Sequence, residues 1–526
     1  SRVQRVFGAL TSSNTNDTLQ AIQRALAPRL AAHRDAISLN DTLFQRIKSL
    51  YDRRDSLGLD SLQRLVVERY YRDFVRAGAL LSEADKTRLR ALNREQASLT
   101  NEFGRRLLAA TRAGGVVVDD STQLAGLSSG EISAAAGAAT TRSLTGRWLL
   151  PLQNTTQQPA QASLRNRELR ERLFRASTTR AMRGDSNDTR EIILRLAQLR
   201  PERARLLGFP SLAAYVLDEQ MAKTPEGALG LLTDLAAPAT AKARGEAAAM
   251  QRVIDAQQGG FALAPWDWQY YSEQVRVAQY ALDEEQIKPY FELDRVLRDG
   301  AFYTANQLYG LTFRERRDLP VYHPDVRVFE VFDADSSSIG LLYADYYKRD
   351  NKQGGAWMSN FVDGSPLLGT KPVVYNVCNF TKPAAGQPAL LTYDDVGTMF
   401  HEFGHALHGL LNAVPYPRLA GNVPTDFVEV PSQFMEHWAL YPSVFAHYAR
   451  HHQTLAPMPA DLVAKIRRST TFNQGFITTE YVAASLLDLV WHALPAGPTQ
   501  ANVDSFEVAA LRRYGVDLPE VPPRYR

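Results

Sequence analysis

Cysteine is almost missing from this chain of 526 residues, which has only Cys378. A single cysteine excludes an internal disulfide. Cys378 lies in a run of residues typical of a strand, and we expect it to be an inert core residue. A chain without disulfides fits the cytoplasm, which is the compartment we predict, and it is also compatible with a periplasm.

An excess of charge of one sign is missing too, because the formal net charge is only +3. Such a balance gives no indication of a nucleic-acid partner or of an acidic membrane surface. Arginines alternate with acids along residues 167–175, as on a solvated helix face. Long hydrophobic runs are also lacking, and none is long enough to span a bilayer. We therefore predict neither a nucleic-acid partner nor a membrane partner.

The chain does have enough apolar residues for a substantial core, since 45% of it is hydrophobic. Its length allows two or more domains or one large body with several lobes. A capping box at Ser82 predicts a long helix that ends near Gly114. We predict three segments, which are a helical lobe at 1–150, a connecting helical region at 151–320 and a catalytic lobe at 321–526.

The pattern changes in the middle of the chain, where four runs rich in β-forming residues predict strands at 326–333, 340–347, 355–362 and 372–380. Together they predict a small, mainly antiparallel sheet in a mainly α-helical protein. We expect residues 356–360 to form an edge strand to which an extended peptide adds through main-chain hydrogen bonds. The candidate substrate-binding residues are Gly355, Ala356, Trp357 and Met358. A protected edge without a ligand is the alternative.

The most informative motif is HEFGH at residues 401–405. On a helix, residues four apart lie on one face, so His401 and His405 can bind one zinc ion. Glu402 beside them can reach a water on that ion and act as general base. The alternative is two ordinary core or surface histidines.

The surrounding sequence favours the zinc interpretation. Thr392 and Asp395 fit a capping box that begins a helix about two turns before His401. Apolar residues recur with helical period through the motif, which predicts a mostly buried helix. Gly404 weakens a helix, but it allows another element to approach closely.

A zinc site needs a third protein ligand, and Glu429 is the best candidate. It lies in a predicted second helix with Asp426 as its N-cap, and Glu436 shares its face seven residues on. A first-turn acid favoured by the helix dipole is the alternative for Glu429. Residues predicted to orient the ligands, or else to be ordinary solvated, capping or packing residues, are His408, Asp426, Gln433 and Glu436.

With these motifs in place, the chain resembles the thimet oligopeptidase and neurolysin family of zinc metallopeptidases, and within it the bacterial peptidyl-dipeptidase branch. The matching stretches are WDW (266–268), YALDE (280–284), YHPDVR (322–327), GGAWMSNF (354–361), PVVYNVCNF (372–380), KPAAG (382–386), HEFGH (401–405), DFVE (426–429) and PSQ (431–433). The resemblance implies that His401, His405 and Glu429 bind one Zn²⁺ and that Glu402 is the general base. It also implies two helical lobes around a deep, narrow channel, which is a zincin-like arrangement.

The resemblance fails at both ends of the chain. Family members continue beyond the position of Arg526 with a glycine- and tyrosine-rich segment that contacts substrate, and Tyr525 does not replace it. They also begin several dozen residues before the position of Ser1. We therefore expect a truncated chain, whose missing C-terminal segment a separate polypeptide supplies.

The predicted function is that of a metallopeptidase that releases dipeptides from the free C-termini of short peptides, using zinc-activated water. Two alternatives remain at this point. One is an oligoendopeptidase of the same family, which cuts inside short peptides. The other is a zinc- and peptide-binding fragment without turnover.

Overall fold

Helices make up most of the protein in the computed structural model, which describes residues 2–152, 158–384, 386–421, 423–498 and 502–523. In the first half the helices are α1 (Arg2–Ser13), α2 (Asp17–Ser38), α3 (Asp41–Asp52), α4 (Ser61–Ala77), α5 (Glu83–Ala113), α6 (Ser129–Thr141), α7 (Arg167–Thr178), α8 (Arg190–Leu206), α9 (Leu212–Leu217) and α10 (Pro225–Ala256). In the second half they are α11 (Trp268–Tyr280), α12 (Glu284–Ile287), α13 (Leu293–Arg295), α14 (Tyr303–Tyr309), α15 (Tyr393–Leu410), α16 (Val430–Ala439), α17 (Pro442–Tyr448), α18 (Ala460–Ser469), α19 (Gln474–Ala493) and α20 (Val503–Arg513). The predicted class, mainly α with a small sheet, is confirmed.

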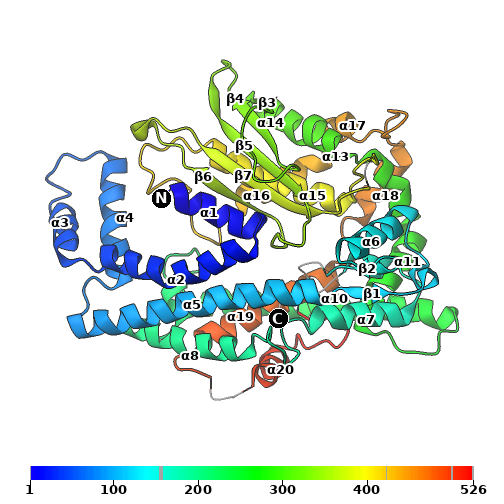
Figure 1. The fold of residues 1–526 in the computed structure, drawn as a ribbon, viewed down its shortest axis with the longest axis horizontal. Coiled ribbons are helices and arrows are strands. Elements are labelled where there is room, and N and C mark those ends of the chain that lie inside the picture. Colours follow the sequence, from blue (N-terminus) through cyan, green and yellow to red (C-terminus); the bar gives the residue numbers. More distant parts are fainter. Residues whose placement is uncertain (1, 153–157, 385, 422, 499–501, 524–526) are drawn as a thin grey trace.

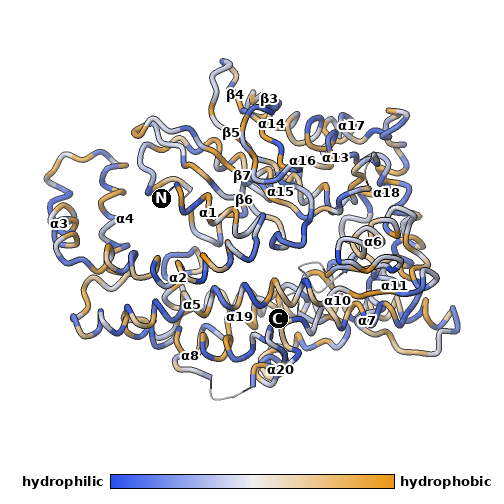
Figure 2. The backbone as a smooth tube through the Cα atoms, in the orientation of Figure 1, coloured by the Kyte–Doolittle hydropathy of each residue, from blue (hydrophilic) through white to orange (hydrophobic). Residues whose placement is uncertain are grey.

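The long helices begin where the sequence predicts them to begin. Ser82 is the N-cap of α5, and its hydroxyl accepts a hydrogen bond from the backbone N–H of Asp85. Along the tube of Figure 2, hydrophobic and hydrophilic residues alternate in α5 and α10, as expected of amphipathic helices. None of the helices in the described ranges combines the length and the apolar character that crossing a membrane requires.

The sheet lies in the second half of the chain. Its strands are β3 (Thr312–Arg316), β4 (Arg327–Phe332), β5 (Ser338–Tyr347), β6 (Trp357–Val362) and β7 (Val373–Phe380), in the spatial order β3-β4-β5-β7-β6. The β5–β7 pair is parallel and the other three pairs are antiparallel, so the prediction of a mainly antiparallel sheet is confirmed. Strand β3 was not predicted. A separate two-stranded sheet pairs β1 (Val116–Val118) with β2 (Trp148–Leu150).

Helix α15 packs against the sheet and contributes to the largest hydrophobic core of the described residues. From α15 this core takes Val396, Met399, Phe400, Phe403 and Leu407, and from the sheet it takes Phe329, Ala344, Val374 and Cys378. Cys378 is fully buried, and burial raises the pKa of its thiol well above the usual value. The prediction that this cysteine is an inert core residue is therefore confirmed.

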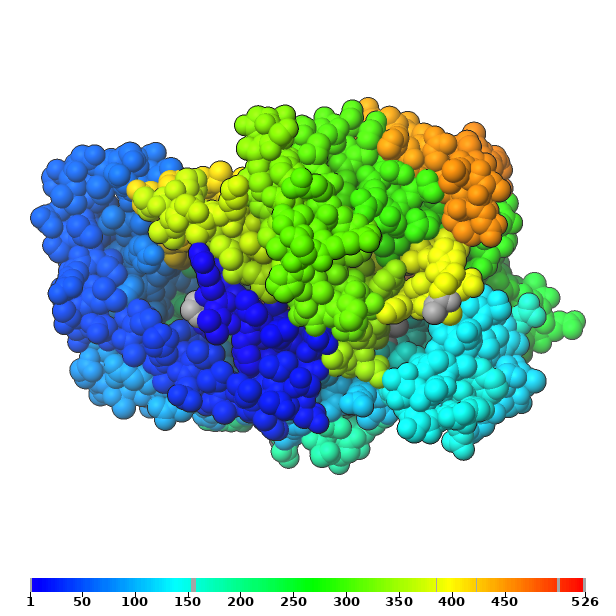
Figure 3. Space-filling view, turned by 45° about the horizontal axis from the view of Figure 1, so that its top comes forward, coloured from blue at the N-terminus to red at the C-terminus, as the bar shows by residue number. Residues whose placement is uncertain are grey.

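Two parts of the molecule are visible in the ribbon of Figure 1. The upper part contains the sheet with α15, α16 and α17, and the lower part contains α5, α8, α10 and α19. In Figure 3 the surface is hollowed between α3 and α4 (blue, left) and the yellow-green part that carries the sheet. Helix α19 packs on α10 in a core of its own. The predicted division of the chain into segments at residues 150 and 320 stays a prediction.

Candidate metal centre

The histidine motif lies in the middle of α15, where the helix is held at its start and along its buried face. Thr392 Oγ1 accepts a hydrogen bond from Asp395 N at 3.0 Å, and Asp395 Oδ2 accepts one from Thr392 N at 3.0 Å. This is the predicted capping box. The opposite face of α15 is packed in the core, so the position of the helix is fixed. The side chains of the motif therefore project from a rigid support.

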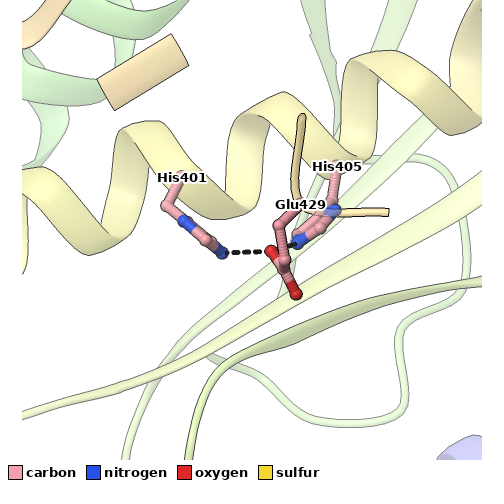
Figure 4. A group of neighbouring side chains, drawn as sticks. All are labelled: His401, His405 and Glu429. Carbon is pink, nitrogen blue, oxygen red and sulfur yellow. Dashed lines mark ion pairs between the residues drawn. The ribbon is translucent and has the colours of Figure 1, made fainter. Parts of the chain in front are cut away.

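Three predicted ligands converge on one point. His401 Nε2 and His405 Nε2 each lie 3.1 Å from Glu429 Oε2. Figure 4 shows both imidazoles extending from α15 toward the Glu429 carboxylate, which comes from the chain just before α16. The donor atoms of all three residues lie within 4.8 Å of one another.

The donors fit a tetrahedral zinc ion. Ligands about 2.0–2.1 Å from such an ion lie about 3.3 Å from each other, and the two histidine–glutamate distances are 3.1 Å. Two imidazoles and one carboxylate form a donor set that catalytic zinc sites use, with the fourth position left for water or substrate. These residues are therefore suited to hold zinc.

Neighbouring side chains fix two of the three ligands. Glu436 Oε1 lies 2.6 Å from His401 Nδ1, so the other ring nitrogen of His401 is directed at the ligand cluster. Ser432 Oγ donates to Glu429 Oε2 at 2.8 Å. Burial opposes a charge on His401, but the hydrogen bond to Glu436 and the charges of Glu402, Glu436 and Glu429 together raise its pKa. For His405, burial is the main cause and lowers the pKa.

Glu402 lies beside the donors and is almost completely buried, with 4% of its surface exposed. Its Oε2 atom has no hydrogen-bond partner among the described residues. Burial raises the pKa of Glu402 to about 7, while His401 lowers it and Glu429 raises it further. A buried carboxylate with an unused oxygen is costly for folding, and such costs concentrate where a site performs chemistry.

Gly404 permits the second helix to approach α15. A Cβ at this position would lie 2.5 Å from the Pro431 carbonyl oxygen and 2.7 Å from Ser432 Cα. The backbone that follows Glu429 therefore touches the backbone of α15 with no side chain between. This close approach, expected from the sequence, is what carries Glu429 to the two histidines.

Of the four residues predicted to orient the ligands, Glu436 makes a side-chain hydrogen bond to a ligand, and Gln433 bonds to Glu429 only through its backbone N–H, which donates to the Glu429 backbone oxygen at 2.9 Å. The carboxylate of Asp426 accepts hydrogen bonds from Met221 N and Ala222 N, both at 2.9 Å, and α16 begins at Val430 with Glu429 as its N-cap residue. The prediction of Asp426 as N-cap and ligand-orienting residue is wrong, because its hydrogen bonds connect it to a distant segment. Gln433 is exposed, and His408 lines an apolar cavity next to Gly404.

The predicted substrate-binding residues lie at the beginning of the edge strand. Trp357 and Met358 belong to β6, which among the described strands pairs with β7 alone, and Ala356 and Gly355 precede it. Gly355 has a φ of 84°, a left-handed conformation that favours glycine. An edge strand at 356–360 is thus confirmed in outline, and binding of a peptide there stays a prediction.

Two contributors were missed from the sequence. Ser432 follows Glu429 by three residues, a helical spacing that was available as a signal. Asn376 on β7 donates from Nδ2 to the Glu402 backbone oxygen at 2.8 Å and so connects the sheet to the motif. No local pattern reveals this second contact, because it depends on how α15 lies across the sheet.

Comparison with known proteins identifies the family. Residues 160–526 match the description "Peptidase family M3". Dipeptidyl carboxypeptidase of Escherichia coli (strain K12) is 53% identical over 526 residues, which cover 100% of this chain and 77% of that protein. Its counterpart in Salmonella typhimurium (strain LT2) is 52% identical, covering 100% of this chain and 78% of that protein. Oligopeptidase A of E. coli is 34% identical over 492 residues, or 91% of this chain and 72% of that protein. The predicted resemblance is confirmed, and the chain belongs to peptidase family M3.

Proposed function

We propose that this protein is a zinc-dependent peptidyl-dipeptidase, which removes dipeptides from the free C-termini of short peptides. The observation that carries the chemistry is the convergence of His401, His405 and Glu429 on one point beside Glu402. The identity of 53% to a dipeptidyl carboxypeptidase supports the dipeptide product. The 34% identity to an oligopeptidase makes internal cleavage the weaker alternative.

His401, His405 and Glu429 would hold the zinc ion. When bound, zinc lowers the pKa of a coordinated water to about 7 and polarises a carbonyl group. Glu436 keeps the His401 ring in orientation through its 2.6 Å contact with Nδ1, and Ser432 does the same for the Glu429 carboxylate. Removing either support would loosen the site without removing a ligand.

Glu402 would move the protons of the reaction. It takes a proton from the attacking water and delivers it to the amine that leaves when the peptide bond breaks. The unpaired Oε2 atom is available to accept that proton. Burial raises the pKa of Glu402, which favours uptake of that proton.

Strand β6 would hold the peptide. Its outer edge has no partner strand within the described part of the sheet, so an extended peptide can add there through main-chain hydrogen bonds. Gly355, Ala356, Trp357 and Met358 would contribute this edge. Main-chain bonds do not read side chains, which fits an enzyme that acts on many short peptides in a channel between two lobes.

A matched pair of peptides tests the proposal. One N-acetylated tetra-alanine peptide has a free C-terminal carboxylate, and the other has a C-terminal amide. We expect the zinc-loaded protein to release dialanine from the first and to leave the second intact, as followed by mass spectrometry. Equal cleavage of both peptides would indicate an endopeptidase, and binding without products would indicate a peptide-binding protein.

A further inference from the structure

A second cavity lies close to the start of the edge strand. Its volume is about 220 Å³, and its wall combines the C-terminal half of α5 with Arg142 and residues of the segment 348–354. Helix α5 belongs to the lower part of the molecule and the segment 348–354 follows β5 in the upper part (Figure 1), so the cavity spans the boundary between them.

The charges that line this cavity are unbalanced. Arg112, Arg142 and Lys348 contribute three cations, and Asp350 is the carboxylate that opposes them among the described lining residues. Asp350 lies 3.1 Å from Arg142 Nη2 and neutralises that arginine. Lys352 also lines the wall, but its ammonium group is bonded to Asp345, which is itself fully buried. Arg112 and Lys348 therefore keep an uncompensated positive charge.

Lys348 is the more informative of these two cations. Its side chain is half-buried, and its ammonium group has no hydrogen bond or ion pair with the described residues. Burial lowers the pKa of Lys348, and although Asp350 opposes that shift, the charges of Arg180 and Arg142 reinforce it. A cation in such surroundings destabilises the fold unless an anion joins it.

Lys348 is not needed to hold its own segment in place. Lys352 Nζ already bonds to Tyr347 O at 2.9 Å and to Cys378 O at 2.6 Å, which ties the segment to the end of the sheet. Arg349 adds two hydrogen bonds to Asp345, at 2.8 and 2.7 Å. A structural role for the Lys348 charge therefore has no contact to support it.

The stretch of chain between the cavity wall and the level of the metal centre is short enough for a dipeptide and a lysine side chain together to span it. Met358 pairs with Asn376, whose side chain bonds to the Glu402 backbone, so Met358 marks the level of Glu402 on the sheet. Gly354 in the cavity wall precedes Met358 by four residues, which span at most about 13 Å. Two extended peptide residues cover about 7 Å, and a lysine side chain reaches about 6 Å.

We propose that this cavity binds the free C-terminal carboxylate of the peptide substrate, with Lys348 as the principal cation and Arg112 as its helper. The peptide then runs antiparallel to β6, with its last two residues extending from the metal centre toward Gly354. The assignment rests on the proposed function, since only an enzyme that acts at free C-termini needs such an anchor. It makes Lys348 and Arg112 specificity-determining residues.

The test measures binding without turnover. In a Glu402→Gln background loaded with zinc, calorimetry gives the dissociation constants of N-acetylated tetra-alanine as free acid and as amide. A charge-assisted hydrogen bond predicts that the acid binds about tenfold more tightly or better. Adding Lys348→Ala should abolish this preference by weakening acid binding alone, and Lys348→Arg should retain most of it. Lys348→Met, which keeps the aliphatic stem, replaces the alanine variant if thermal unfolding shows that the latter is damaged.

Lys371 provides a matched control. It is exposed, has no ion pair with the described residues, and precedes β7 at the opposite end of β6, because Val362 pairs with Val373. Lys371→Ala should keep the preference for the acid. Loss of the preference in Lys371→Ala but not in Lys348→Ala would overturn the proposal and reverse the direction of the peptide.

Two further outcomes would also overturn the assignment. One is an undiminished acid preference in both Lys348→Ala and Lys348→Met. The other concerns added sodium phosphate. If phosphate tightened binding of the amide peptide, and Lys348→Ala removed this effect, the cavity would hold a free anion and not the carboxylate of the peptide. Failure of the proposed function is distinguishable, because it requires the unmutated protein to cleave acid and amide equally well.

Discussion

Two buried clusters of charge in the same part of the chain differ in how completely they are satisfied. Around Asp345, which is fully buried, both carboxylate oxygens accept hydrogen bonds from Arg349, and Lys352 and Tyr322 add one each. Around Glu402, one buried oxygen has no partner among the described residues. In the first cluster, called the complete cluster here, protein groups satisfy both carboxylate oxygens, although Arg349 Nε has no partner among the described residues. In the second, the incomplete cluster, one carboxylate oxygen is left unsatisfied. Buried charge alone therefore does not mark a reactive site, whereas an unused buried oxygen beside converging donors does.

The largest effect should come from the incomplete cluster. Glu402→Gln keeps the shape of the side chain but cannot accept a proton, so peptide hydrolysis should fall by roughly 10²–10⁴-fold. Zinc content, measured by elemental analysis, should stay the same. Hydrolysis at the normal rate would remove Glu402 from its assigned role.

Removing a ligand should act on the metal first. Glu429→Ala leaves only the two imidazoles as ligands, so we expect the variant to lose both zinc and activity on dialysis. Zinc added at a concentration equal to that of the protein should not restore the activity. Glu436→Ala is the matched control, because it removes a support of His401 and should weaken zinc affinity by only about 10- to 100-fold. Equal zinc retention in both variants would contradict the assignment of Glu429 as a ligand.

The complete cluster should respond in stability. Lys352→Met removes the ammonium group that bonds to Asp345, Tyr347 and Cys378, and leaves part of a buried anion unpaired. We expect the free energy of unfolding to fall by about 3 kcal/mol in denaturant titrations. Lys371→Met, at an exposed position, should change it by no more than about 0.5 kcal/mol. If Lys352→Met left the free energy of unfolding unchanged, the ammonium group would not be needed for stability, and this cluster would also be a candidate ligand site.

Glu284 offers a smaller and pH-dependent effect. Burial raises its pKa from 4.5 to about 7, although Arg276 opposes the shift. The folded state therefore holds this proton more tightly than the unfolded state, so its contribution to stability falls as pH rises from about 4.5 to about 7. Glu284→Gln cannot ionise and still accepts the bond from Tyr393 N. It should be about 1–2 kcal/mol more stable than the unmutated protein at pH 8 and about equal at pH 4.5.

The sequence predicted those parts of the site whose geometry is local. His401, Glu402 and His405 lie within about one helical turn, so their spacing places them. The spacing of Glu429 and Glu436 predicts a shared face, but the meeting of Glu429 with the histidines depends on the close approach at Gly404. Asp426 was misassigned because its partners, at residues 221 and 222, are some 200 positions away. Strand β3 has the sequence TFRER, and it was missed because its charged residues do not give the apolar alternation typical of a strand. Pairing with β4 stabilises it in the fold. The predicted partner chain and the predicted compartment stay predictions, since the structure of a single chain determines neither.

The pairing of α10 with α19 has a consequence for how this protein is made. Gly475 at the start of α19 lies so close to α10 that a Cβ there would be 2.4 Å from the Ala243 nitrogen. The two helices are separated by more than 200 residues of sequence. During synthesis the apolar stripe of α10 therefore leaves the ribosome long before its partner exists, and at about 5–20 residues per second it waits for at least about ten seconds. Nascent chains that stall in this interval should be bound by chaperones that recognise exposed apolar helices.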